Sequence, residues 1–147
     1  MTRLNLGYGP YPLEGFDNLD QPRWRFEDGL PAYADGEVKA ITISHSLMYL
    51  PLDLWPMLLT EVYRVLEPGG VVRITEDNTE DPESERFGGW HDAVTMTGPA
   101  MMRAHLKAAG FRVRKHTAAS SGFRDGSLRQ AHHGDEPKVF FVEGRKP

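Results

Sequence analysis

The chain has 147 residues, of which 39% are hydrophobic and 26% are charged, and its formal net charge is −4. This length suffices for one domain, residues 1–147, and is short for two. The absence of cysteine excludes disulfides, thiolate metal sites and a cysteine nucleophile. The acidic balance does not indicate a nucleic-acid surface, because such surfaces usually carry a basic excess. Neither a signal peptide nor an apolar run of membrane-spanning length is recognisable, so we expect a cytoplasmic protein without a membrane partner.

Short strands joined by turns are predicted for the first third of the chain. Apolar and β-branched runs predict strands over Arg3–Leu6, Phe16–Leu19, Trp24–Glu27 and Ala40–Ser44. Only six residues, including two prolines, lie between Gly9 and Phe16. That distance is too short for a helix between the first two strands.

A helix and a strand are predicted for the middle of the chain. We expect Asp53 to cap the helix, with Pro56 in its first turn. Pro68-Gly69-Gly70 is expected to end the helix, and Val71–Thr75 reads as the next strand. Helical spacing of the apolar residues predicts one buried face, formed by Trp55, Leu59, Val62, Tyr63 and Leu66.

The last part of the chain predicts one more helix and two strands. The acidic segment Glu76–Gly89 lacks apolar periodicity and predicts a loop, either solvated or acting as a lid over a site. Thr97 is expected to cap a helix that ends at Gly110, with Met102, Leu106 and Ala109 facing inward. The final strands are Phe111–Lys115 and Val139–Glu143, separated by a polar loop over Ser120–Pro137.

The alternation of strands and helices predicts an α/β fold with a mostly parallel sheet. Ligands of such sheets bind outside the carboxyl ends of the strands. Several glycine-rich or polar segments follow predicted strands, namely Gly7–Gly9, Asp20, Ser44-His45 and Thr75–Asn78. We therefore expect the functional site at this edge of the sheet.

Motifs spread over most of the chain resemble those of class I S-adenosylmethionine-dependent methyltransferases, in particular small type 11-like ones. The most specific is the R-V-L-x-P-G-G element within Glu61–Gly70, between an acidic helix and a strand. The other matching stretches are Leu4–Gly9, Pro12–Asp20, Asp28–Pro31, Asp35-Gly36, Ile43–Leu50, Met102–Phe111 and Phe141–Lys146. The resemblance implies a Rossmann-like sheet with flanking helices, reduced by the loss of the usual first helix.

The resemblance also implies S-adenosylmethionine as cofactor and a role for each matched residue. It places the turn Gly7, Tyr8 and Gly9 at the methionyl part and Asp20 at the ribose hydroxyls. It places Asp28, Gly29 and Leu30 at the adenine, and Ser44 and His45 near the sulfonium and the substrate entrance. Methyl transfer is a direct displacement that alignment can promote, so no nucleophile is required. The candidate catalytic residues are His45 and His91.

Each of these candidates has a structural alternative. Asp28 is equally typical of a turn before Gly29, and His45 of a histidine packed under the sheet edge. His91, beside Trp90, would serve as a loop anchor. The pair His132-His133 resembles a metal cluster in composition, but its spacing matches no standard zinc pattern. We therefore assign no metal site.

Departures from the family pattern concern the substrate side and the missing helix. Met48-Tyr49 stands where the family often has Glu-His, Lys39 replaces a frequent aspartate, and Tyr8 replaces a smaller residue. The missing helix leaves one face of the sheet poorly covered. We expect a partner subunit, such as a second copy in a homodimer, or the chain's own long loops to cover it.

Three functions follow from these patterns. The first is methyl transfer from S-adenosylmethionine to an unidentified small-molecule or macromolecular acceptor. The second is a non-catalytic S-adenosylmethionine-binding or partner protein with the same fold. The third, a nicotinamide-dependent oxidoreductase, is disfavoured, because its fingerprint needs a third glycine opening a helix and a more distant acidic residue than Asp20.

Overall fold

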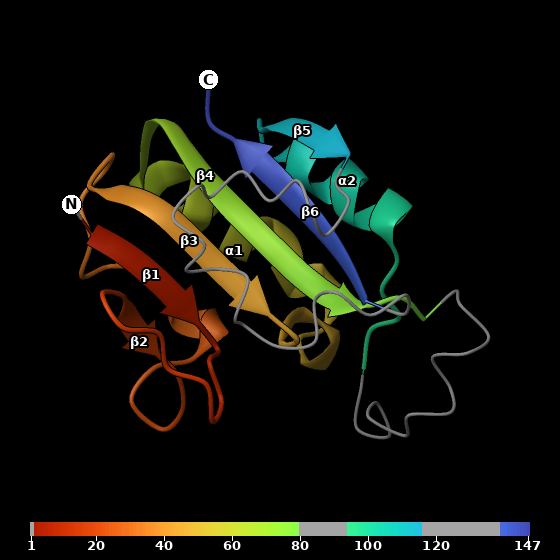
Figure 1. Cartoon of the computed structure of the whole chain (residues 1–147), viewed down its shortest axis with the longest axis horizontal. Coiled ribbons are helices and arrows are strands. Elements are labelled where there is room, and N and C mark those ends of the chain that lie inside the picture. The colour runs from red at the N-terminus through yellow and green to blue at the C-terminus, as the bar shows by residue number, and fades with distance from the viewer. Residues whose placement is uncertain (1, 80–93, 116–138) are drawn as a thin grey trace.

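A six-stranded mixed sheet forms the centre of the molecule (Figure 1). The structure is a computed structural model, and it describes residues 2–79, 94–115 and 139–147. The strand order is β2-β1-β3-β4-β6-β5; the first four of these run parallel, and β6 runs antiparallel to both β4 and β5. The strands are β1 (Thr2–Leu6), β2 (Asp17–Leu19), β3 (Val38–Ser44), β4 (Leu66–Asp77), β5 (Arg112–Lys115) and β6 (Val139–Arg145).

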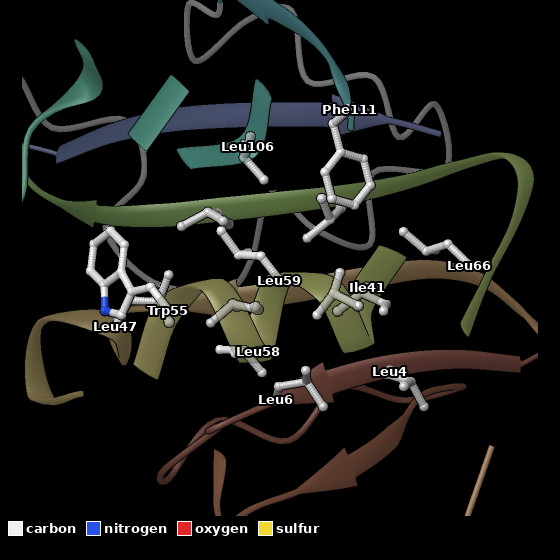
Figure 2. Close-up of a cluster of buried hydrophobic side chains, with 14 of the residues drawn as sticks. Leu4, Leu6, Ile41, Leu47, Trp55, Leu58, Leu59, Leu66, Leu106 and Phe111 are labelled. Atoms are coloured by element: carbon white, nitrogen blue, oxygen red, sulfur yellow. The ribbon is translucent and has the colours of Figure 1, made fainter. Parts of the chain in front are cut away.

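Both described α-helices, α1 (Trp55–Val65) and α2 (Pro99–Ala108), pack on the same face of the sheet. Between them and the strands lies the apolar core, in which Leu58 and Leu59 of α1 lie close to Ile41 of β3 (Figure 2). Burial of these side chains is the main contribution to the stability of this layer. Three short 3₁₀ turns complete the described helices, namely η1 (Phe26–Asp28), η2 (Leu47–Tyr49) and η3 (Leu52–Leu54).

The connection between β1 and β2 contains no helix, as the sequence predicts. Asparagine side chains hold it instead. Asn5 Nδ2 donates to Asn18 Oδ1 at 2.8 Å, and the Asn18 amide bonds both the backbone N–H (2.9 Å) and the carbonyl (3.1 Å) of Leu13. These bonds satisfy backbone groups that a helix would otherwise pair internally.

The second face of the sheet carries more polar side chains than the first. Side chains alternate along a strand, so the residues between the core positions of β1, β3, β4 and β6 face away from α1 and α2. The buried polar residues among them are Asn5, Thr42, Ser44, Arg73, Thr75 and Glu143, and the apolar Ala40 and Val71 are buried there too. The described part of this face thus presents no large exposed apolar side chain. Whether a second copy of the chain contacts this face stays a prediction.

Three expected helix boundaries are wrong in detail. Asp53 lies within η3 and does not cap α1, whose N-cap is Leu54. The Thr97 hydroxyl donates to the Asp77 carbonyl at 2.7 Å and is therefore not the cap of α2, whose N-cap is Gly98. Helix α1 already ends at Val65, because Leu66 adopts an extended conformation before Pro68 is reached.

Two further segments differ from the sequence expectation. Trp24–Glu27 is not a strand: the Asp28 carboxylate accepts the Arg25 backbone N–H at 2.9 Å and closes the turn η1. Glu76 and Asp77 are not loop residues but the end of β4. The expected loops from residue 80 to 89 and over Ser120–Pro137 lie outside the described residues. Within the described ranges, no helix is both long and apolar enough to cross a bilayer.

Candidate functional site

The carboxyl ends of β1, β2 and β3 border one cavity of about 290 Å³, here called the glycine-turn cavity. It brings Gly7, Gly9, Asp20 and His45 together, as the sequence predicts for this edge. The residues that line it are Gly7, Gly9, Asp20, Gln21, Trp24, Arg25, Phe26, Glu27, His45, Ser46, Tyr49 and Leu50.

The two glycines of the turn differ in what surrounds them. Both have left-handed backbones, with φ of 65° at Gly7 and 54° at Gly9. A Cβ on Gly7 would come within 2.6 Å of Ser46 Oγ and 2.9 Å of the Phe26 ring, whereas one on Gly9 would meet nothing within 4 Å. Gly7 is thus required by close packing inside the protein, and Gly9 leaves its backbone open to a ligand.

Asp20 joins the carboxyl end of β2 to this turn. Its Oδ2 accepts the Gly9 backbone N–H at 2.7 Å, and its Oδ1 accepts the N–H of Gln21 at 2.8 Å. A carboxylate offers about four lone-pair sites, so about two are left after these bonds. Asp20 can therefore hold the turn and accept ligand hydroxyls at the same time.

His45 follows β3 with a φ of 51°, which is unusual for a residue other than glycine. Its backbone N–H donates to the Thr75 carbonyl at 2.8 Å, and its Nδ1 lies 3.5 Å from Asp77 Oδ1. Ser44, the preceding sequence candidate, is buried and lines neither cavity described here. Ser46 lines the glycine-turn cavity, and its hydroxyl lies 2.8 Å from the Gly7 carbonyl.

A second cavity of about 740 Å³ adjoins the first, and we call it the loop cavity. The two cavities share Asp20, Gln21 and Trp24. The loop cavity contains the remaining cofactor candidates, which are Tyr8, Asp28, Gly29 and Leu30. The predicted site residues other than Ser44 and His91 are thus divided between two neighbouring hollows that meet at Asp20.

Glu61 and Arg64 of α1 clamp the segment that forms one wall of the loop cavity. Glu61 Oε2 accepts the Leu30 N–H at 2.9 Å, and Arg64 donates to the carbonyls of Leu30 (3.0 Å) and Tyr33 (3.1 Å). The Arg64 guanidinium also bonds both Glu61 oxygens, which lowers the pKa of the Glu61 carboxyl. Arg64, the first residue of the R-V-L-x-P-G-G motif, and Glu61, three residues before it, thus position a wall of the loop cavity and do not line it.

Trp24 separates the two cavities and is fixed by its own contacts. Its indole Nε1 donates to the Gly29 carbonyl at 2.8 Å, and its ring meets that of Phe26 edge to face at 4.9 Å between centroids. Sequence reasoning missed Trp24 as a site residue. Its signal was an aromatic residue in a proline-rich segment between a strand and a turn.

Glu76, near the end of β4, contacts the segment that follows β3. The sequence placed Thr75–Asn78 at this edge but gave Glu76 no role of its own. Its carboxyl group is fully buried, and Oε1 accepts the backbone N–H groups of Ser46 (2.9 Å) and Leu47 (2.7 Å). Burial raises the pKa of this carboxyl to about 8. The period of two along β4, with Val72 and Ile74 facing the core, could have shown that Glu76 faces inward as well.

Other candidates lie outside the described residues. These are His91 with Trp90, and the pair His132-His133, to which no metal site was assigned. They stay sequence predictions.

Comparisons with known proteins identify the fold of the chain. No protein-family model and no curated protein matches the chain. A SAM-dependent methyltransferase of Archaeoglobus fulgidus superimposes with a TM-score of 0.69 at 15% identity, over 99% of this chain and 86% of that one. A chain from the Haloferax volcanii complex that contains the Trm112 methyltransferase activator gives 0.65 at 18% identity, over 99% and 82%.

A third similar structure is a SAM-dependent methyltransferase of Thermotoga maritima, described as a possible histamine N-methyltransferase. It gives a TM-score of 0.64 at 15% identity, over 99% of this chain and 82% of that one. The expected fold class is confirmed: the chain has the Rossmann-like α/β fold of class I S-adenosylmethionine-dependent methyltransferases.

Proposed function

We propose that this protein binds S-adenosylmethionine at the two adjoining cavities and transfers its methyl group to an acceptor. The observation that supports the proposal is the convergence of the open Gly9 backbone, the Asp20 carboxylate and His45 around one cavity at the strand ends. In an α/β fold this edge is the usual position of a nucleotide-like ligand. Because the similar structures are methyltransferases, we prefer methyl transfer to the other functions that this fold supports.

The chemistry of the donor set fits this cofactor. Asp20 has lone pairs to accept both ribose hydroxyls, and Gly9 allows close approach of the methionyl part to the backbone. The loop cavity extends from Asp20 to Asp28, Gly29 and Leu30, which would contact the adenine. The loop cavity alone, at about 740 Å³, is ample for a ligand of this size.

Bound S-adenosylmethionine supplies an activated methyl group on a positively charged sulfur. The chain's contribution is alignment: it holds the donor at a fixed turn and brings the acceptor into line. Tyr49 is half exposed at the edge of the glycine-turn cavity and would guide an acceptor. His45, beside Asp77, is the described residue placed to take a proton from the acceptor.

A second candidate function is donor binding without catalysis, as a regulatory or partner protein. The observation in its favour is that the polar groups of the site already serve the protein's own structure. Both oxygens of Asp20 bond backbone N–H groups, and Phe26 packs against Gly7 inside the cavity. Among the similar structures, one comes from a complex with a methyltransferase activator, so a partner protein is a reasonable proposal for this chain.

Calorimetric titration of the purified chain with S-adenosylmethionine, S-adenosylhomocysteine and NAD tests these proposals. We expect both adenosyl ligands to bind and NAD not to bind. Binding of NAD alone would contradict the proposal. Donor binding without methyl transfer in a broad acceptor screen would favour the non-catalytic alternative.

A further inference from the structure

We infer that Glu76 is a positioning residue of the glycine-turn cavity, whose buried carboxyl group fixes the backbone at residues 46 and 47 against the Gly7 turn. Glu76 ends the core-facing series of β4, one strand away from the cavity. It does not line the cavity and touches no ligand position. Its effect passes through the residues that it holds.

The hydrogen bonds form a continuous path from Glu76 to the turn. Glu76 Oε1 accepts the N–H of Ser46 and the N–H of Leu47. The Ser46 hydroxyl lies 2.8 Å from the Gly7 carbonyl and 2.9 Å from the Ser44 carbonyl and shares its single proton between them, and it stands where a Cβ on Gly7 would clash. The backbone N–H of Gly7 in turn donates to the Leu19 carbonyl at 2.7 Å, at the end of β2. Displacement of Ser46 would therefore shift the wall of the cavity.

The segment after β3 needs such an anchor because its own local structure is weak. It forms the single 3₁₀ turn η2, and the N-cap Ser46 makes no side-chain capping bond. The first N–H groups of a helical turn lack intrahelical partners and must find others. Glu76 supplies one oxygen to two of them, in a place that water does not reach.

The other carboxyl oxygen, Oε2, has no hydrogen-bond partner among the residues that the structure describes. An ionised carboxylate with an oxygen left unsatisfied in the core is costly, whereas the neutral acid is less so. Burial accordingly raises the pKa of Glu76 from 4.5 to about 8. An acidic group whose pKa is raised in the folded protein contributes most to the free energy of unfolding at pH values below its pKa in the unfolded chain. This contribution is lost as the pH rises from about 5 through 8.

Other titratable groups lie on the elements around Glu76. They are Asp77 on β4, His45 after β3, which lies beside Asp77, and His105 on α2, which packs against Trp55. All three are present in the wild type and in a Glu76→Gln variant. The difference between these two proteins therefore isolates the Glu76 contribution to any pH dependence.

Hydrogen exchange of the free protein tests the inference without any ligand, so its failure and that of the proposed function are distinguishable. Glu76→Ala removes the acceptor, and Ile74→Ala is the matched control, because it truncates a fully buried neighbour on the same face of β4. We expect the amides of Ser46 and Leu47 to exchange on the order of tenfold faster in Glu76→Ala than in Ile74→Ala. Equal exchange in the two variants would overturn the inference.

Glu76→Gln keeps the accepting oxygen and imitates the neutral acid, and it guards against failure of the alanine variant to fold. We expect wild-type protection of Ser46 and Leu47 in Glu76→Gln. We also expect the urea midpoint of the wild type to fall between about pH 5 and pH 8 more steeply than that of Glu76→Gln. Lost protection, or the same slope in both proteins, would overturn the inference.

Discussion

The helix-covered side of the sheet and the cavity edge are built by different interactions. On the helix side, apolar side chains such as Leu59, Val62 and Ile41 are buried in one hydrophobic cluster, part of which Figure 2 shows. At the cavity edge, a few polar side chains, among them Asp20 and Arg64, hold turns through their backbone groups. Stability of the domain and geometry of the site therefore depend on different residues.

This difference bears on the missing helix between β1 and β2. Loss of a helix would normally expose an apolar sheet face, yet most of the buried residues described on that face are polar. Asn5 and Asn18 tie the short connection down, and Arg73 of β4 stands in register with Glu143 of β6. Opposite charges in such cross-strand pairs favour the sheet. The residues on both faces of the sheet are thus compatible with the absence of the helix between β1 and β2.

The strongest test of this division is Leu59→Ala, in the middle of α1. Leu59 is almost fully buried and touches neither cavity. We expect the free energy of unfolding to fall by about 2–5 kcal/mol, from lost burial and the cavity that remains. Urea denaturation followed by circular dichroism measures this. Met57→Ala, on the exposed side of the same helix, is the control, and we expect a change of about 0.5 kcal/mol or less.

The affinity for S-adenosylmethionine tests whether stability and site geometry depend on different residues. S-adenosylmethionine should bind folded Leu59→Ala as tightly as it binds the wild type, because the hydrogen bonds of the cavity edge do not involve this side chain. A loss of affinity in Leu59→Ala, measured well below its unfolding midpoint, would show that core and site are not separable.

Arg64→Met tests a residue that belongs to both regions, since it lies on α1 and clamps the wall of the loop cavity. The variant loses the bonds to the carbonyls of Leu30 and Tyr33 and leaves Glu61 without its cation. We expect a destabilisation of about 1–3 kcal/mol, typical of hydrogen bonds to a charged group. Faster amide exchange at Leu30 would locate the effect.

Arg64→Lys is the matched variant for this clamp. It keeps the charge but not the planar fork that reaches several acceptors at once. We expect intermediate stability and intermediate exchange at Leu30. Wild-type behaviour of Arg64→Lys would mean that charge alone, and not the geometry of the guanidinium, holds the wall.

Asp20→Ala tests the cavity edge itself. We expect binding of S-adenosylmethionine to weaken by about 1–3 kcal/mol, from the loss of charge-assisted hydrogen bonds. Calorimetric titration at constant pH measures the change. Glu14→Ala is the control, because Glu14 is an exposed carboxylate in the connection before the same strand and lines neither cavity. Equal affinity of Asp20→Ala and the wild type would remove Asp20 from the site.

The sequence predicted most of the strands, and it placed several candidate site residues at one edge of the sheet. Val71–Thr75 and Ala40–Ser44 were found from their β-branched runs, and the six residues after Gly9 correctly excluded a helix. The resemblance to methyltransferases identified the edge where Gly7, Asp20 and His45 meet. Such features depend on local composition and on spacing along the chain.

What could not be predicted depends on contacts between distant residues. The approach of Glu76 to Ser46 spans 30 positions, and that of Arg64 to Leu30 spans 34. Asp53 and Thr97 had the right chemistry for caps, yet Thr97 found a partner in Asp77 across the fold. Local propensity is a weak guide where tertiary hydrogen bonds compete for the same side chain.

The smallest expected effect concerns the outer rim of the cavity edge, where Tyr33 closes the loop cavity. Its hydroxyl donates to Asp17 Oδ2 at 3.0 Å, and burial together with this carboxylate raises the pKa of Tyr33 to about 12. Tyr33→Phe should cost about 0.5–1.5 kcal/mol of unfolding free energy near neutral pH, as for a single hydrogen bond. Because the raised pKa belongs to the folded state, the stability that the Tyr33 hydroxyl contributes is complete below about pH 10 and is lost towards pH 12. The two proteins should therefore converge in urea midpoint over this range, and a phenolate absorbance titration of Tyr33→Phe should lack the step near pH 12 that Tyr33 contributes. A constant difference up to pH 12 would show that ring packing, and not the bond to Asp17, is what Tyr33 adds to the rim.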